Sequence, residues 1–443
     1  MKPALPRAAV FAVLALAALA LALPAAARAD TLPDSSRVAP DSSSVLDFTP
    51  GADEAAPFAE GEDLDRGGRW LRAPFGDALL TDPDVWLERE RDRDRDQHAG
   101  LALDYNRVDA LRLGASYELQ SPERMLPRLG ARLEYAFGRD RVLYGAQLEQ
   151  PLAPPGRLAL GVTMVRRTDH SDLQQVDDLE NSLALLLGRQ DYRDYFEREG
   201  VGAYLSWRVP DFSTISFHVR NDQYRSLLLS DETRSWLHTN RTLRDNPAIT
   251  EGTARSLTLR LERLAHRTRR TRAGLYHWVE LERAGYGMGG DFRYTRALAD
   301  LRSVVRLSPA TTLSLRAVGG HSFDGTLPPQ KEFTLGGVDG LRAHSFAAYR
   351  GDRLALAQAE YDVGLWRLRA HRMEGGLHAL AFVDAGRAWR SDGPGFDLDH
   401  QHVQADGGFG LGTAEDNLRV YFAKNLQDPG SNFVISARLQ RPF

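Results

Sequence analysis

Apolar and polar side chains alternate along most of this chain, and that alternation limits what the chain can fold into. In residues 128–137 (RLGARLEYAF), Leu129 and Leu133 share one face of an extended chain, while Arg132 and Glu134 share the other. A period of two with charges on one face is typical of a β-strand between an apolar and a polar environment. The pattern predicts an all-β fold, and it fits both a soluble sandwich and a membrane barrel.

The lengths of the connections distinguish these two folds. The sixteen strands that we predict lie near residues 99–106, 110–120, 128–137, 141–152, 157–167, 200–209, 213–221, 252–263, 272–284, 290–306, 311–320, 352–367, 376–389, 403–413, 417–425 and 432–443. The long connections are 168–199, 222–251, 321–351 and 390–402. Each follows an odd-numbered strand, whereas the connections after even-numbered strands are short. Long loops at one end and tight turns at the other predict a 16-stranded antiparallel transmembrane β-barrel of the outer-membrane type.

The first 97 residues differ from the rest. Residues 1–29 combine a basic start, an apolar run and the small-residue site Ala27-Arg28-Ala29, which predicts a cleaved signal peptide; an uncleaved anchor is the alternative. Residues 30–97 are acidic and rich in Ser, Pro and Ala, so we expect a largely disordered segment. The barrel then spans 98–443. The chain has no cysteine, which excludes disulfides and thiol chemistry.

Two charges occupy unexpected positions between Phe333 and Gly386. Arg342 lies in a glycine-rich loop, and Asp384 interrupts an apolar strand, ALAFVDAGRAW. A charge taken from water into a partly dry lumen is costly unless it is paired, and an arginine binds a carboxylate well. The two residues are therefore expected to pair and pin the loop to the barrel wall. The alternative is an exposed arginine and an aspartate that faces water in the lumen.

These residues resemble motifs of the BamA/TamA superfamily of outer-membrane assembly factors. The tip motif of the family's inward-folded loop, between strands 11 and 12, corresponds to Leu341-Arg342-Ala343-His344. The partner motif on strand 13, aromatic-x-Asp-x-Gly, corresponds to Phe382-Val383-Asp384-Ala385-Gly386. The resemblance implies that Arg342 folds into the lumen and pairs with Asp384, with Glu360 as a further partner. Glycine at 386 would let another backbone approach closely.

The family's periplasmic POTRA modules have no counterpart among the strand signals of residues 30–97. The chain therefore resembles a POTRA-lacking member, and Tyr105-Asn106-Arg107-Val108-Asp109 is similar to the opening of small members of that kind. The aromatic Phe443 after an alternating strand resembles the terminal signal that assembly machinery reads in outer-membrane barrels.

The resemblance implies protein insertion into, or translocation across, the outer membrane of a Gram-negative-type bacterium. The implied partners are membrane lipid and unfolded outer-membrane or secreted polypeptides. The short and poorly patterned first strand fits a weak seam between the first and last strands. A passive channel or structural barrel without assembly activity is the alternative, because the POTRA modules that capture substrate in the family are missing.

No sequence feature indicates an enzyme, a cofactor or a metal site. Gly320-His321-Ser322-Phe323-Asp324 lacks the last glycine of a nucleophile elbow. The Asp and His residues of 392–402 have no diagnostic ligand spacing, and the basic stretch 266–272 is more simply a solvated turn than a nucleic-acid site.

The connection 168–199 contains the leucine-rich stretch 180–196. A short amphipathic lid helix there would place Leu179, Leu183, Leu186 and Leu187 on one face. An irregular loop is the alternative.

Overall fold

The structure is a computed structural model. It describes residues 97–119, 125–153, 157–171, 173, 176–209, 213–237, 242–263, 274–308, 310–370, 373–391, 403–413, 418–428 and 430–439. The predicted signal peptide, the acidic segment up to residue 96 and Phe443 lie outside these residues. Among the residues described, no helix is long and apolar enough to cross a membrane.

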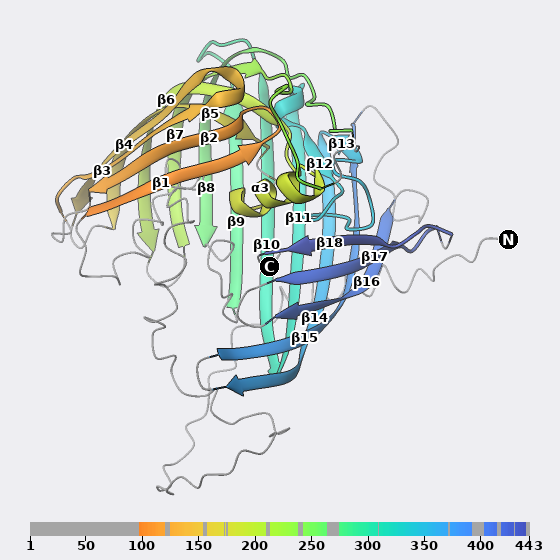
Figure 1. The fold of residues 1–443 in the computed structure, drawn as a ribbon. Helices are drawn as coiled ribbons and strands as arrows, with labels where there is room; N and C mark the ends of the chain where they lie inside the picture. Colours follow the sequence, from red (N-terminus) through yellow and green to blue (C-terminus); the bar gives the residue numbers. More distant parts are fainter. Residues whose placement is uncertain are drawn as a thin grey trace, which may run out of the picture.

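Sixteen strands form one antiparallel sheet in which neighbours follow chain order (Figure 1). They are β1 (Gln97–Asn106), β2 (Ala110–Leu119), β3 (Arg128–Ala136), β4 (Arg141–Ala153), β5 (Leu158–His170), β6 (Tyr195–Val209), β7 (Ser213–Ser226), β8 (Gly252–Arg263), β9 (Gly274–Ala284), β10 (Tyr294–Ser308), β11 (Thr311–Gly325), β14 (Arg353–Ala370), β15 (Met373–Trp389), β16 (Gln404–Thr413), β17 (Arg419–Asn425) and β18 (Val434–Arg438). The predicted number of strands and their antiparallel order are confirmed.

The remaining elements of the described residues belong to connections at the long-loop end of the sheet. They are the helix α3 (Asp178–Gly188), the short 3-10 turns η3 (Phe137–Arg139) and η4 (Pro329–Lys331), and the small strands β12 (Phe333–Leu335) and β13 (Tyr349–Gly351). The last two pair with each other in the connection between β11 and β14. Their pairing was not predicted, because three-residue strands are too short to show a period.

The outer surface of the sheet is apolar and the inner surface is charged. On β3, Leu129 and Leu133 are exposed, whereas Arg128 and Glu134 are buried. The inner charges pair across strands, as Arg128 Nη1 does with Glu149 Oε1 of β4 at 3.1 Å. A soluble sandwich buries its leucines and exposes its charges, so this inverted arrangement is that of a membrane barrel.

The first strand is better patterned than we expected. Leu101 and Leu103 of β1 are exposed on the outer face, while Ala102 and Asp104 are buried on the inner face. All ten residues of β1 pair with β2. The other edge of β1 has no strand partner among the described residues, and neither does the outer edge of β18. The two ends of the sheet lie on either side of α3 (Figure 1).

Strands beside long connections extend further than predicted, and β6 and β7 show this most clearly. β6 begins at Tyr195, five residues before the predicted start, and β7 runs on to Ser226. At the start of β6 four successive side chains are buried, so the apolar and polar alternation is absent although the pairing with β5 and β7 continues. Apolar and polar side chains alternate where one face of a strand meets lipid and the other meets the lumen. The alternation is lost where both faces of the strand are covered by other parts of the protein.

Candidate functional site: the lumen loop

The lumen loop, residues 326–352 between β11 and β14, turns back on itself at two glycines. Gly336 and Gly337 have φ values of 119° and 88°. The N–H of Gly337 donates to the carbonyl oxygens of Leu341 and His344 at 3.1 and 3.2 Å. A Cβ at position 336 would lie 2.4 Å from the Ser345 oxygen. Only glycine fits this close approach, and the turn presents residues 341–344 as a compact tip.

Arg342 at the tip is held by two carboxylates and two aromatic rings. Its Nη1 lies 2.9 Å from Glu360 Oε2 on β14, and its Nε lies 3.2 Å from Asp384 Oδ2 on β15. The guanidinium carbon is 4.1 Å from the centre of the Phe382 ring and 4.7 Å from that of Tyr421. The residues singled out from the sequence therefore meet in space, and Tyr421 of β17 joins them.

The surroundings keep Arg342 charged although it is only 2% exposed. Burial by itself lowers the pKa of the guanidinium, but the Asp384 and Glu360 carboxylates outweigh burial and raise that pKa above its ordinary value. Faces of aromatic rings add favourable interaction with a cation. Removal of either side of such a cluster leaves a buried charge without compensation.

A second contact fixes the tip to β16. The backbone N–H of Ala343 donates to Asp406 Oδ2 at 2.7 Å, and His344 Nδ1 lies 3.0 Å from Asp406 Oδ1. Asp406 is fully buried. Asp406 was not predicted from the sequence. Like Asp384, however, it is a single charged residue in a strand of small or apolar residues, Ala405-Asp406-Gly407, and could have been found in the same way.

The base of the loop is bonded to three strands. The carbonyl oxygen of Asp339 accepts from Arg316 of β11 at 2.9 Å, and its carboxylate lies 2.8 Å from Arg438 of β18. Gln358 of β14 donates to the carbonyl oxygen of Gly340 at 2.9 Å. Together with the tip contacts, these bonds tie the loop to β11, β14, β15, β16 and β18.

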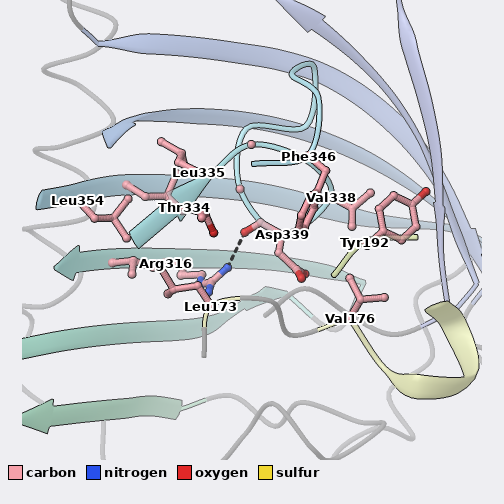
Figure 2. Close-up of a pocket in the computed structure, with 14 residues that line it drawn as sticks. Leu173, Val176, Tyr192, Arg316, Thr334, Leu335, Val338, Asp339, Phe346 and Leu354 are labelled. Carbon is pink, nitrogen blue, oxygen red and sulfur yellow. Dashed lines mark hydrogen bonds between the residues drawn. The ribbon is translucent and has the colours of Figure 1, made fainter. Parts of the chain in front are cut away.

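Apolar side chains of the loop also pack against the connection before β6. Figure 2 shows Val338 and Phe346 of the lumen loop opposite Leu173, Val176 and Tyr192. The pocket between them has a volume of about 30 Å³. That is room for one or two water molecules, so the pocket is a small gap in the packing.

The structure also shows the surroundings of the other residues that were singled out from the sequence. Leu341 is fully buried in a cluster with Phe333 and Leu354. A Cβ at Gly386 would lie 2.7 Å from the Ala355 oxygen, so a glycine is needed where β14 passes. Ser322 lies within β11, where no turn of the nucleophile-elbow type occurs.

Neither part of the chain that we weighed for metal or nucleic acid is described, since residues 264–273 and 392–402 lie outside the described ranges. Within the described ranges, no group of three or more His, Cys, Asp or Glu side chains could hold a metal ion.

The turn between β1 and β2 is a further buried charge site. Arg107 is fully buried, with Nη2 3.2 Å from Asp194 Oδ1 and Nη1 3.4 Å from Asp191 Oδ1. Asp109 Oδ1 lies 2.6 Å from Arg139 Nε. Ion pairs therefore fix β1 at its long-loop end.

The comparisons with known proteins agree with this geometry. The sequence model of the Omp85 superfamily domain matches residues 104–415. Among solved structures, BamA from Haemophilus ducreyi lacking POTRA domains 1–3 has a similar fold, with a TM-score of 0.52 and 12% identity over 77% of this chain and 70% of that chain.

Two further structures are matched more weakly. CdiB from Acinetobacter baumannii has a TM-score of 0.41 and 14% identity over 77% of this chain and 59% of that chain. CdiB from Escherichia coli has a TM-score of 0.45 and 12% identity over 78% of this chain and 62% of that chain. No curated protein sequence matches significantly. Because the superfamily domain covers well over half of the sequence, the chain belongs to the Omp85 superfamily.

Proposed function

We propose that this protein inserts polypeptides into the outer membrane or passes them across it. The observation that carries the proposal is the pair of sheet edges at β1 and β18, which are not paired with each other among the described residues. A free strand edge offers backbone N–H and C=O groups to an extended polypeptide, which can add to it as a further strand. The partners would be unfolded outer-membrane or secreted chains.

Membership of an outer-membrane superfamily supports this function and its location in a Gram-negative bacterium. Export through a cleaved signal peptide over residues 1–29 and a non-enzymatic role are parts of the same proposal. The lumen loop would contribute by keeping the inner wall ordered from β11 to β18. An unfolded polypeptide could then pair with a strand edge while the rest of the sheet stays intact.

A passive channel is the less favoured function. The tip of the lumen loop is buried against β14, β15 and β16. A wide pore that is open all the time does not agree with a loop held in this way. Planar-bilayer recording of the purified barrel should therefore show no steady wide conductance.

Depletion in the native host tests the proposed function. Quantitative proteomics of outer membranes should show that other barrel proteins, or a surface-exposed partner, decrease after depletion. Wild-type protein and the variant Arg157→Ala, which changes an exposed turn arginine, should both restore them. Arg342→Ala should not. An unchanged outer-membrane composition after depletion would contradict the proposal.

A further inference from the structure

Helix α3 touches both free edges of the sheet. On the β1 side, the backbone N–H of Tyr105 donates to Ser182 Oγ at 2.9 Å, and Ser182 Oγ donates to Asp104 Oδ1 at 2.9 Å. Figure 1 shows the helix between β1 and β18. The helix therefore bonds to an edge that no strand covers within the described part of the chain.

The other flank of the helix bonds to β18. Glu180 Oε1 lies 2.5 Å from Arg438 Nε, and Glu180 Oε2 accepts from the backbone N–H of Leu439 at 3.1 Å. Both edges thus donate a backbone N–H to a side chain of α3. An unsatisfied N–H facing a bilayer costs several kcal/mol, so these bonds replace part of the strand pairing that the edges lack.

The order of residues around the helix axis suits this position. Each residue advances about 100° around an α-helix, so Glu180 and Ser182 project about 160° apart, toward opposite flanks. Asn181 and Leu185 lie between the flanks on one side and are fully buried. Asn181 Nδ2 donates to the Tyr195 hydroxyl at 2.9 Å, so this side of the helix packs against the start of β6.

The remaining side of α3 is a partly exposed strip of leucines. Leu179 and Leu187 are 36% and 41% exposed, and Leu183 and Leu186 are half-buried beside them. A lid helix with these four leucines on one face was one of the two alternatives for this stretch. The helix forms over Asp178–Gly188, so the irregular loop is wrong, and the leucine face lies opposite the buried Asn181 and Leu185.

The leucine strip continues the apolar surface of the barrel. The neighbouring β1 exposes Leu101 and Leu103 on its outer face at 61% and 53%. Asp104 and Tyr105, the β1 residues that α3 contacts, directly follow them in the strand. The helix is therefore level with part of the strand surface that meets lipid in a membrane barrel.

Contacts at both ends of α3 hold this orientation. Asp177 caps the first turn by accepting from the N–H of Leu179 at 2.9 Å. At the other end, Ser235 Oγ donates to the Leu185 oxygen at 2.9 Å, and the N–H of Trp236 donates to the Leu186 oxygen at 2.7 Å. Carbonyl groups of the last turn need such donors, so a second long connection fixes the helix in place.

We propose that α3 is a segment of the barrel wall, and that its leucine strip (Leu179, Leu183, Leu186 and Leu187) is a lipid-binding surface for acyl chains. Hydrogen bonds to both edges, a buried polar side and an exposed apolar side suit a helix that takes the place of strands at the lipid boundary. The proposal concerns the resting barrel and holds whether or not the protein assembles others.

Site-directed spin labelling tests the proposal, and the absence of cysteine from the chain makes every label unique. Leu179→Cys and Leu187→Cys are labelled separately in the full chain, in vesicles of phosphatidylethanolamine and phosphatidylglycerol. Leu103→Cys on β1 serves as the lipid-facing reference, and Glu232→Cys in an exposed loop serves as the water-facing reference. The measurement is collision with oxygen, which partitions into lipid, and with a water-soluble nickel chelate.

Both α3 labels should show the high oxygen-to-nickel accessibility ratio of Leu103→Cys. A ratio like that of Glu232→Cys would place the strip in water and overturn the proposal. Low accessibility to both reagents would mean that protein, such as a second copy of the chain, covers the strip, and would also overturn it. Heat-modifiable migration in gels confirms that each labelled barrel is folded, and the two positions give independent readings.

Discussion

Arg342 lies closer to Glu360 than to Asp384, with separations of 2.9 and 3.2 Å. The guanidinium therefore joins two adjacent strands, β14 and β15, at the inner wall. Sequence reasoning favoured Asp384 as the main partner and Glu360 as an addition. Because Arg342 contacts both carboxylates, Glu360 and Asp384 both contribute to the anchoring of the loop.

Arg342→Ala should release the lumen loop from the wall. The substitution leaves the buried Asp384 carboxylate without the cation beside it, a loss of about 3–5 kcal/mol for a buried pair, while Glu360 keeps its ion pair with Arg419. Limited proteolysis of the membrane-inserted barrel should then cut within residues 326–352. Arg157→Ala, an exposed turn substitution, should leave the digestion pattern as it is. Resistance of Arg342→Ala to cleavage would show that the contacts of Asp339 and Asp406 suffice.

Asp384→Ala should release the loop less than Arg342→Ala does. The arginine keeps Glu360 and the two aromatic rings, so the expected loss is about 1–3 kcal/mol, the cost of unsatisfied buried polar groups. The cleavage rate under the same protease should fall between those of the wild type and Arg342→Ala. Equal rates for the two variants would mean that Asp384 alone carries the anchoring.

Asp406→Ala should loosen the tip next to Arg342. The N–H of Ala343 loses its acceptor and His344 loses its partner, at a cost of about 1–3 kcal/mol. Hydrogen exchange of the amides at 341–346 should accelerate. Asp406→Asn keeps an oxygen acceptor for Ala343 and is the matched control, with exchange near that of the wild type. Similar exchange in both variants would rule out the Ala343 contact as an anchor.

The sequence predicts this barrel where lipid and lumen act on opposite faces of one strand. On β3, Leu129 is exposed on the outer face and Arg128 is buried on the inner face. The same alternation predicted the number of strands and the order of long and short connections. Arg342 and Asp384 were predictable because a lone charge in an apolar segment needs a partner.

Other contacts depend on tertiary positions that no local pattern encodes. Leu439 and Glu180 bond across 259 positions of the chain, and Arg107 binds aspartates from a distant connection. The spacing of the leucines in α3 indicated an amphipathic helix. The spacing alone does not determine whether the apolar face of the helix contacts protein or lipid. That choice depends on the two strand edges beside the helix.

Arg107→Ala should weaken the attachment of β1 at the long-loop end. The arginine is fully buried between Asp191 and Asp194, so its removal costs about 3–5 kcal/mol. The temperature at which the barrel loses its compact form in gels should fall. Arg157→Ala again supplies the control. An unchanged transition temperature would mean that the β1–β2 pairing by itself determines stability at this end.

Glu180→Gln should weaken the attachment of α3 to β18 while leaving it attached to β1. The substitution removes the ion pair with Arg438 but keeps an oxygen acceptor for the Leu439 N–H, and Ser182 keeps its bonds to β1. A loss of about 1–3 kcal/mol shifts the ratio of attached to released helix by about 5- to 150-fold. Double electron–electron resonance between labels at Leu183→Cys on α3 and Ile435→Cys on β18 should gain a longer distance.

The matched pair of labels at Leu183→Cys and Leu103→Cys reports on the β1 side and should keep a single narrow distance in Glu180→Gln. Glu232→Gln, a change of the same kind in an exposed loop, should alter neither distance. Broadening of both distances in Glu180→Gln would indicate unfolding of the helix. No change in either distance would mean that Asp339 alone satisfies Arg438 and that the Glu180 contact does not hold the helix to β18.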